Sequence, residues 1–166
     1  MDCKILINRN IINILIGDEK VCEEYRLPYL SGPDLCALST EFGLQKSYSW
    51  NGGGVSRWVY MQDLMTYLEK QGRLFELFSR LFDRQYFKEL SKLTSPELVT
   101  STYNSIVDCA IKRINANLIL AKKELRVHKG QFTLTDAGTE PVFIAPKVKV
   151  VDRQYIRELP ERIKDD

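Results

Sequence analysis

The chain has 166 residues, of which 44% are hydrophobic and 28% charged, and its formal net charge at pH 7 is +2. This length and apolar content predict one folding unit with an ordinary hydrophobic core, which excludes an intrinsically disordered chain. No apolar run approaches the roughly 20 residues of a membrane helix, so the sequence predicts a cytoplasmic protein that makes no membrane contact.

The first predicted element lies at 4–17. This segment is dense in Ile and Leu, and we expect it to form a buried strand. A first helix is expected to begin at Pro33, because proline favours the first helical turn, and to end at Gly43. A second helix is expected between Ser56, a favourable N-cap residue, and Gly72. Its apolar stripe comprises Trp58, Met61, Leu64, Met65 and Leu68.

Two more helices follow from apolar residues at helical spacing. The first covers 74–82, and a further turn or two is expected around 86–90. The second is the longest; it is expected to begin with a cap at Ser95 and a proline at Pro96, and to extend to about Lys123. Its apolar face comprises Val99, Tyr103, Ile106, Ala110, Ile114 and Leu118.

Alternating residues on both sides of Lys129-Gly130 predict a β-hairpin over 125–135, with Phe132 and Leu134 facing inward. Another strand is expected within 141–151, where prolines confine it to an edge or to strand ends.

The expected fold class is therefore α+β. A mainly helical bundle would carry a small antiparallel sheet made of the N-terminal strand and the C-terminal hairpin and strand. Residues 1–151 would form a single compact module, and a charged helix at 152–166 would connect it to a further, C-terminal domain. A long helix followed by a hairpin is also the outline of a winged-helix module.

The segment YSWNGGGVSRW at 48–58 places three glycines between two tryptophans, just before a predicted helix. It matches neither of the glycine-rich phosphate-binding patterns, G-x-G-x-x-G and G-x-x-x-x-G-K-[ST]. Two interpretations stay open. The favoured one is a turn that lets the two indole rings pack, and the other is an anion site that uses backbone N–H groups near Arg57.

Groups that could perform chemistry are sparse. Four widely spaced cysteines and one histidine, His128, argue against a zinc site and predict free thiols. The run Asp18-Glu19-Lys20 has the D-x-K spacing of some metal-dependent nucleases, but the rest of that pattern is missing. The sequence therefore predicts no enzyme, no catalytic residue, no metal and no cofactor.

Basic residues outnumber acidic ones between 109 and 149. If the helix and hairpin act as a winged helix, the phosphates of a nucleic acid would be contacted by Lys122, Lys123, Arg126 and Lys129. The alternative is that these residues are solvated groups at a helix end and a strand edge.

Three short motifs resemble the amino-terminal modules of bacterial abortive-infection proteins, which are phage-defence proteins that pair a sensing or assembly region with a toxic domain. The motifs are LPYLSGPDL at 27–35, EFG at 41–43 and SRW at 56–58, and 115–134 is similar as well. The resemblance covers roughly half of the chain. It implies a module that senses, binds or oligomerises, with the toxic activity in a C-terminal domain, and it transfers no catalytic residue.

The residues that this resemblance singles out for ligand or partner binding are Ser31, Gly32, Ser56, Arg57 and Trp58. Arg57 lies in the first turn of a predicted helix, where its charge opposes the helix dipole and needs a compensating partner. That partner would be either a ligand or an internal carboxylate that fastens the 27–33 segment. The expected function is a non-catalytic sensing or interaction module that binds a protein partner or a second copy, with nucleic-acid binding as the alternative.

Overall fold

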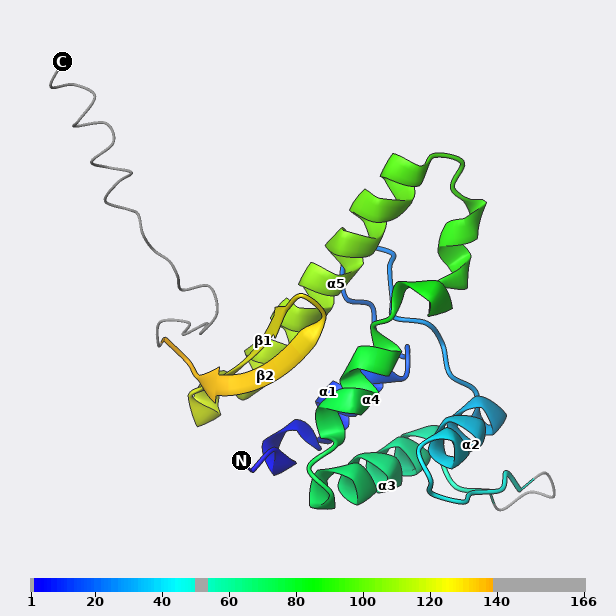
Figure 1. Ribbon diagram of the computed structural model, residues 1–166, viewed down its shortest axis with the longest axis vertical. Coiled ribbons are helices and arrows are strands. Elements are labelled where there is room, and N and C mark those ends of the chain that lie inside the picture. The colour runs from blue at the N-terminus through cyan, green and yellow to red at the C-terminus, as the bar shows by residue number, and fades with distance from the viewer. Residues whose placement is uncertain (1, 50–53, 139–166) are drawn as a thin grey trace, which may run out of the picture.

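The computed structural model describes residues 2–49 and 54–138 (Figure 1). This part of the chain is mostly helical and carries one two-stranded antiparallel sheet, which confirms the α+β class. The α-helices are α1 (Arg9–Leu15), α2 (Gly32–Glu41), α3 (Arg57–Lys70), α4 (Leu74–Leu81) and α5 (Pro96–Leu118), and the strands are β1 (Lys123–His128) and β2 (Gln131–Asp136). Short 3-10 turns are η1 (Lys4–Leu6), η2 (Arg84–Tyr86), η3 (Lys88–Lys92) and η4 (Ile119–Ala121).

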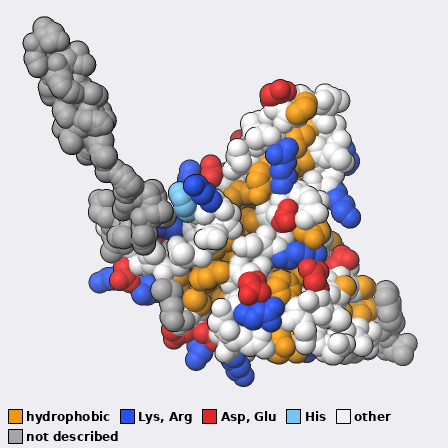
Figure 2. All heavy atoms as spheres, viewed as in Figure 1, with side chains coloured by type: hydrophobic (Ala, Val, Ile, Leu, Met, Phe, Trp, Pro, Cys, Tyr) orange, Lys and Arg blue, Asp and Glu red, His pale blue; other side chains and the backbone are white. Residues whose placement is uncertain are grey.

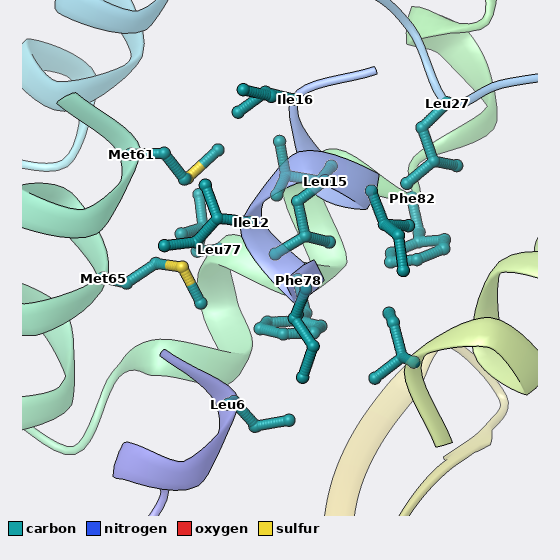
Figure 3. Close-up of a cluster of buried hydrophobic side chains, with 14 of the residues drawn as sticks. Leu6, Ile12, Leu15, Ile16, Leu27, Met61, Met65, Leu77, Phe78 and Phe82 are labelled. Atoms are coloured by element: carbon teal, nitrogen blue, oxygen red, sulfur yellow. The ribbon is translucent and has the colours of Figure 1, made fainter. Parts of the chain in front are cut away.

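The N-terminal strand expected at 4–17 is wrong, because this segment forms η1 and α1. The Asn8 side chain caps α1 by accepting a hydrogen bond from the Ile11 backbone N–H at 3.0 Å. The buried residues of α1 share one broad face of the helix and its polar residues share the opposite face, but such a short run dense in Ile and Leu is also compatible with a buried strand. In Figure 3, Ile12 and Leu15 lie in the middle of the labelled core side chains, with Met61 and Met65 of α3 on one side.

The predicted starts of α2 and α5 are confirmed. Ser31 and Asp34 form a reciprocal capping box at α2, and the Ser95 hydroxyl accepts from Leu98 N at α5. Gly43 follows α2 with a φ of +97°, as a C-terminal stop requires. The predicted stripe of α3 is buried from Met61 onward, whereas Trp58 is partly exposed.

The predicted α4 is confirmed, and the apolar residues at the predicted spacing are buried: Leu74, Leu77, Phe78, Leu81 and, just after the helix, Phe82. Helix α5 buries Ile106, Ala110, Ile114 and Leu118 as expected. It ends at Leu118 rather than near Lys123, because η4 follows and Lys122 adopts a left-handed conformation with a φ of +58° that turns the chain into β1.

The predicted hairpin is confirmed. Lys129 and Gly130 have φ of +51° and +79°, the two positive values that a tight two-residue turn needs. Leu125 pairs with Leu134, and Val127 pairs with Phe132, so these side chains share the inner face of the sheet. That face packs against α4 and α5, with the Phe132 ring 5.7 Å from Phe78 and 5.2 Å from Phe82 (Figure 1).

In the part of the chain that the structure describes, the buried apolar residues form one continuous cluster. All five α-helices and the hairpin contribute residues to it. None of the helices that the structure describes combines the length and the apolar character of a membrane-spanning helix. The strand expected within 141–151 and the helix expected at 152–166 lie outside the described residues.

Candidate functional site

Arg57, the first residue of α3, joins two segments that are distant in sequence. Its Nε donates to the Leu30 carbonyl at 2.6 Å, and its Nη2 donates to the Ile16 carbonyl at 2.9 Å. Its Nη1 forms a salt bridge with Asp18 at 2.5 Å. The compensating partner that the helix dipole demands is therefore an internal carboxylate, and the interpretation that Arg57 fastens the 27–33 segment is confirmed. We call Arg57 and these partners the Arg57 clasp.

Aromatic rings add to the clasp. The Tyr29 ring stacks on the guanidinium, with 4.0 Å between its centroid and the central carbon of Arg57, and Tyr29 itself is exposed. The next residue, Trp58, carries the guanidinium of Arg9 over its ring at 4.2 Å. The first two residues of α3 thus each take part in an arginine–aromatic stack. A stack of this kind contributes about 0.5–1 kcal/mol at exposed sites.

The clasp depends on a close approach of two backbones. Gly17 has a φ of +82°, and a Cβ atom there would lie 2.7 Å from the Pro28 carbonyl oxygen. The Leu30 N–H donates to the Ile16 carbonyl at 3.1 Å, so this oxygen accepts from both Leu30 and Arg57. Only glycine fits at position 17 without strain.

The remaining predicted site residues also have structural roles. Ser31 caps α2, and Gly32 leaves room for the Tyr48 ring, since a Cβ on Gly32 would lie 2.0 Å from a ring carbon. Ser56 is the N-cap residue of α3, but its side chain makes no capping hydrogen bond. Ser31 and Gly32 directly follow Leu30, whose carbonyl binds Arg57, so the structure brings these three predicted residues together. Residues 50–53 of the glycine segment lie outside the described residues.

The predicted basic residues do not converge. Lys123 forms a salt bridge with Asp136 at 2.7 Å, and Arg126 forms one with Glu124 at 3.0 Å. Lys122 and Lys129 stand at opposite ends of β1, and a six-residue strand spans about 20 Å. Figure 2 shows acidic and basic side chains interspersed on the face it presents. The hairpin therefore does not gather these four residues into one anion-facing patch.

The groups considered for catalysis are dispersed. Asp18 is bound to Arg57, and Glu19 forms a salt bridge with Arg113 at 3.5 Å. Over residues 2–49 and 54–138, no three His, Cys, Asp or Glu side chains gather as a metal site. His128 lies exposed at the end of β1, and all four cysteines are free thiols.

A hollow of about 540 Å³ lies along the outer side of α3. Its polar groups are already bonded to one another in part: Lys46 forms a salt bridge with Asp63 at 2.9 Å, and the Tyr67 hydroxyl donates to the Gly43 carbonyl at 3.2 Å. It is lined by Leu44, Lys46, Gln62, Asp63, Thr66, Tyr67 and Lys70. Its groups are ordinary surface residues and do not converge on one point.

Of the large apolar side chains that the structure describes, the most exposed one lies just after α5. In η4, the exposed fraction is 66% for Ile119 and 95% for Leu120, and Ala121 is exposed as well. The sequence contained a signal for this surface that the helix prediction did not use. Leu118, Ile119 and Leu120 are consecutive, and a helix with one buried face cannot turn three consecutive side chains inward. We call Ile119, Leu120 and Ala121 the η4 apolar surface.

Comparison with models of known protein families, with curated proteins and with solved structures finds no match for this chain. The resemblance of the 27–35, 41–43 and 56–58 motifs to abortive-infection modules stays a prediction.

Proposed function

We propose that this chain is a non-catalytic interaction module of an abortive-infection type of bacterial defence protein, and that it associates with a second copy of itself through the η4 apolar surface. The observation that carries the proposal is the 95% exposure of the Leu120 side chain beside an exposed Ile119. The biological setting rests on the resemblance of the motifs described above.

The energetics of the η4 apolar surface favour burial. Removing one leucine or isoleucine side chain from water contributes roughly 1.5–3 kcal/mol, so the burial of Ile119 and Leu120 against a second copy would favour association. Three consecutive uncharged residues, 119–121, make this surface compatible with itself, because no like charges among them oppose each other across a twofold axis. Homo-oligomers with such an axis are the commonest soluble assemblies.

The non-catalytic part of the proposal is supported by the internal hydrogen bonds and ion pairs that the polar side chains make. The guanidinium of Arg57 is bonded to Asp18 and to two backbone carbonyls. Ser31 and Asp34 satisfy each other at the start of α2. Side chains that hold segments together in this way are committed to the scaffold and have little capacity left for a substrate.

The test uses the full open reading frame expressed in a bacterial host that is challenged with a panel of phages. Wild type, Leu120→Ser and Leu98→Ser are compared. Leu98 is the control because it is an exposed leucine, 46% accessible, at the opposite end of α5. We expect wild type and Leu98→Ser to lower the phage yield while infected cells die, and Leu120→Ser to lose that protection. Unchanged phage yield with wild type, or full protection by Leu120→Ser, would overturn the proposal.

A further inference from the structure

Two of the four cysteines are neighbours. Cys22 lies in a tight turn in which Val21 N donates to Tyr25 O at 2.8 Å and Tyr25 N donates to Cys22 O at 2.7 Å. Cys109 lies near the middle of α5. The Cys109 thiol lies close enough to raise the pKa of Cys22. Both are partly exposed and pack against the edge of the core.

An independent contact fixes the same two segments together. Glu19, three residues before Cys22, forms a salt bridge with Arg113, one helical turn after Cys109, at 3.5 Å. Residues 19–22 therefore lie along the 109–113 face of α5. Cys3 and Cys36, in contrast, are buried, with exposed fractions of 8% and 5%.

We propose that Cys22 and Cys109 form a reversible disulfide that ties the 18–30 segment to α5 when the chain meets a low-molecular-weight disulfide such as oxidised glutathione. One cysteine thiolate attacks the small disulfide, which releases one small thiol and leaves a mixed disulfide on the protein. The second cysteine thiolate attacks the protein sulfur of that bond and releases the second small thiol. The two cysteine sulfurs lose two electrons, the small disulfide gains them, and the two cysteine protons end on the released thiols.

The link would act on the Arg57 clasp. Asp18, Tyr29 and Leu30 contact Arg57, and all three belong to the segment that carries Cys22. In the reduced chain, this segment is held by its buried Val21 and Leu27 and by a partly exposed salt bridge to α5, a type of contact that contributes little. In the oxidised chain, a covalent bond holds it between α3 and α5. The disulfide would thus make the stability of the clasp depend on the redox state.

The surroundings of Cys22 slow the reaction of its thiol with an oxidant. Burial, then the hydrogen bond and charge of Cys109, and then the charge of Glu23, raise the pKa of Cys22 to about 11. At neutral pH this thiol is almost fully protonated, and a protonated thiol does not attack disulfides. Glu19 and Arg113 also lie beside the pair, and their salt bridge balances their charges.

The test is to incubate the native chain with graded ratios of reduced to oxidised glutathione, and then to count thiols and map peptides by mass spectrometry. We expect titratable thiols to fall from four to two, with one linked peptide pair that joins Cys22 to Cys109. The unfolding temperature should rise by roughly 5–15 °C, because the bond closes a long loop.

The matched variants are Cys22→Ser and Cys109→Ser, which should form no internal disulfide and show no rise in unfolding temperature. Cys3→Ser should still form the Cys22–Cys109 bond, with its titratable thiols falling from three to one. If a Cys22 or Cys109 variant does not fold, the peptide map of wild type alone decides the matter. The proposal is overturned if native wild type keeps four thiols, links another pair, or forms the Cys22–Cys109 bond only after unfolding in urea. Because the readout is the thiol state of the chain itself, these results are independent of the proposed association through η4.

Discussion

The side chain of Asn115 clamps the backbone of Leu125. Its Oδ1 accepts from the Leu125 N–H at 2.7 Å, and its Nδ2 donates to the Leu125 carbonyl at 3.0 Å. In the register of the hairpin, these two backbone groups face away from β2. The Asn115 amide therefore takes the place of a neighbouring strand and attaches the outer edge of β1 to α5.

Asn115→Ala should lower the free energy of unfolding by about 2 kcal/mol, because it leaves a backbone donor and acceptor of the buried Leu125 without partners. Urea denaturation measures the loss, and faster hydrogen exchange at the Leu125 amide locates it. Asn117→Ala is the control, since Asn117 donates only to the Arg113 carbonyl of its own helix. The control should change stability by less than about 0.5 kcal/mol. Equal effects of the two substitutions would contradict this role of Asn115.

Arg57→Lys should lower the free energy of unfolding by about 1.5–3 kcal/mol. Lysine keeps the charge but cannot reach Asp18 and two carbonyls with one planar fork. Urea denaturation gives the size of the effect. Arg73→Lys is the control, because its partner Glu76 is exposed and its loss should cost less than about 1 kcal/mol. If Arg57→Lys is no more destabilising than Arg73→Lys, the clasp does not hold the 16–30 segment.

The sequence predicted those parts of the fold that are determined locally. Ser95 caps α5 through a bond that spans three residues, and Lys129-Gly130 sets the hairpin through two backbone conformations. Helix α1 was missed because it has only seven residues, and a short run dense in Ile and Leu is compatible with a buried strand as well as with a helix.

The site could be predicted only in part. The position of Arg57 in a helical first turn indicated that it needs a partner. The identity of that partner could not be predicted, because Asp18 and Tyr29 reach Arg57 across 39 and 28 positions, and only the assembled core brings them together. The η4 apolar surface could not be predicted because it depends on where α5 ends. The ends of helices are the least reliable part of a sequence prediction, since tertiary structure influences them.

Tyr103 should make stability fall at alkaline pH. Its hydroxyl donates to the Phe82 carbonyl, and burial, followed by the charge of Asp83, raises the pKa of Tyr103 above its ordinary value of 10.0. The folded state therefore favours the protonated phenol. This contribution is fully present below pH 10 and is lost as the pH rises through the pKa of the folded state.

The corresponding measurement is the urea midpoint of wild type and Tyr103→Phe between pH 8 and pH 11.5. Tyr103→Phe should be less stable than wild type at pH 8, since the Phe82 carbonyl loses its partner, and the difference should shrink as the pH rises. A difference that stays constant over this range would show that ionisation of Tyr103 does not affect folding.

Binding to nucleic acid is tested by the salt dependence of affinity for duplex DNA and RNA. Four contacts acting together would change the slope of log K against log salt by about 3–4 when they are neutralised. Because Lys123 and Arg126 are paired within the hairpin, we expect the change to be smaller than about 2. The neutralised variant replaces Lys122, Lys123, Arg126 and Lys129 by glutamine, and its control replaces four exposed lysines elsewhere, Lys4, Lys20, Lys88 and Lys92.

A slope that falls by about 3–4 only in the first variant, with a loss of more than tenfold in affinity, would favour a winged-helix nucleic-acid binder over an interaction module. Equal and small changes of the slope in the two variants would show that any binding depends on the overall charge of the protein and not on these four residues.

Sedimentation velocity of the purified chain from roughly 1 μM to 1 mM tests most directly whether the η4 apolar surface joins two copies. Wild type and Leu98→Ser should shift from monomer to dimer with rising concentration, whereas Leu120→Ser should weaken the dimer at least tenfold and keep the stability of wild type, since its side chain is 95% exposed. A chain that stays monomeric throughout this range, or a Leu120→Ser variant that dimerises as wild type does, would contradict association through this surface.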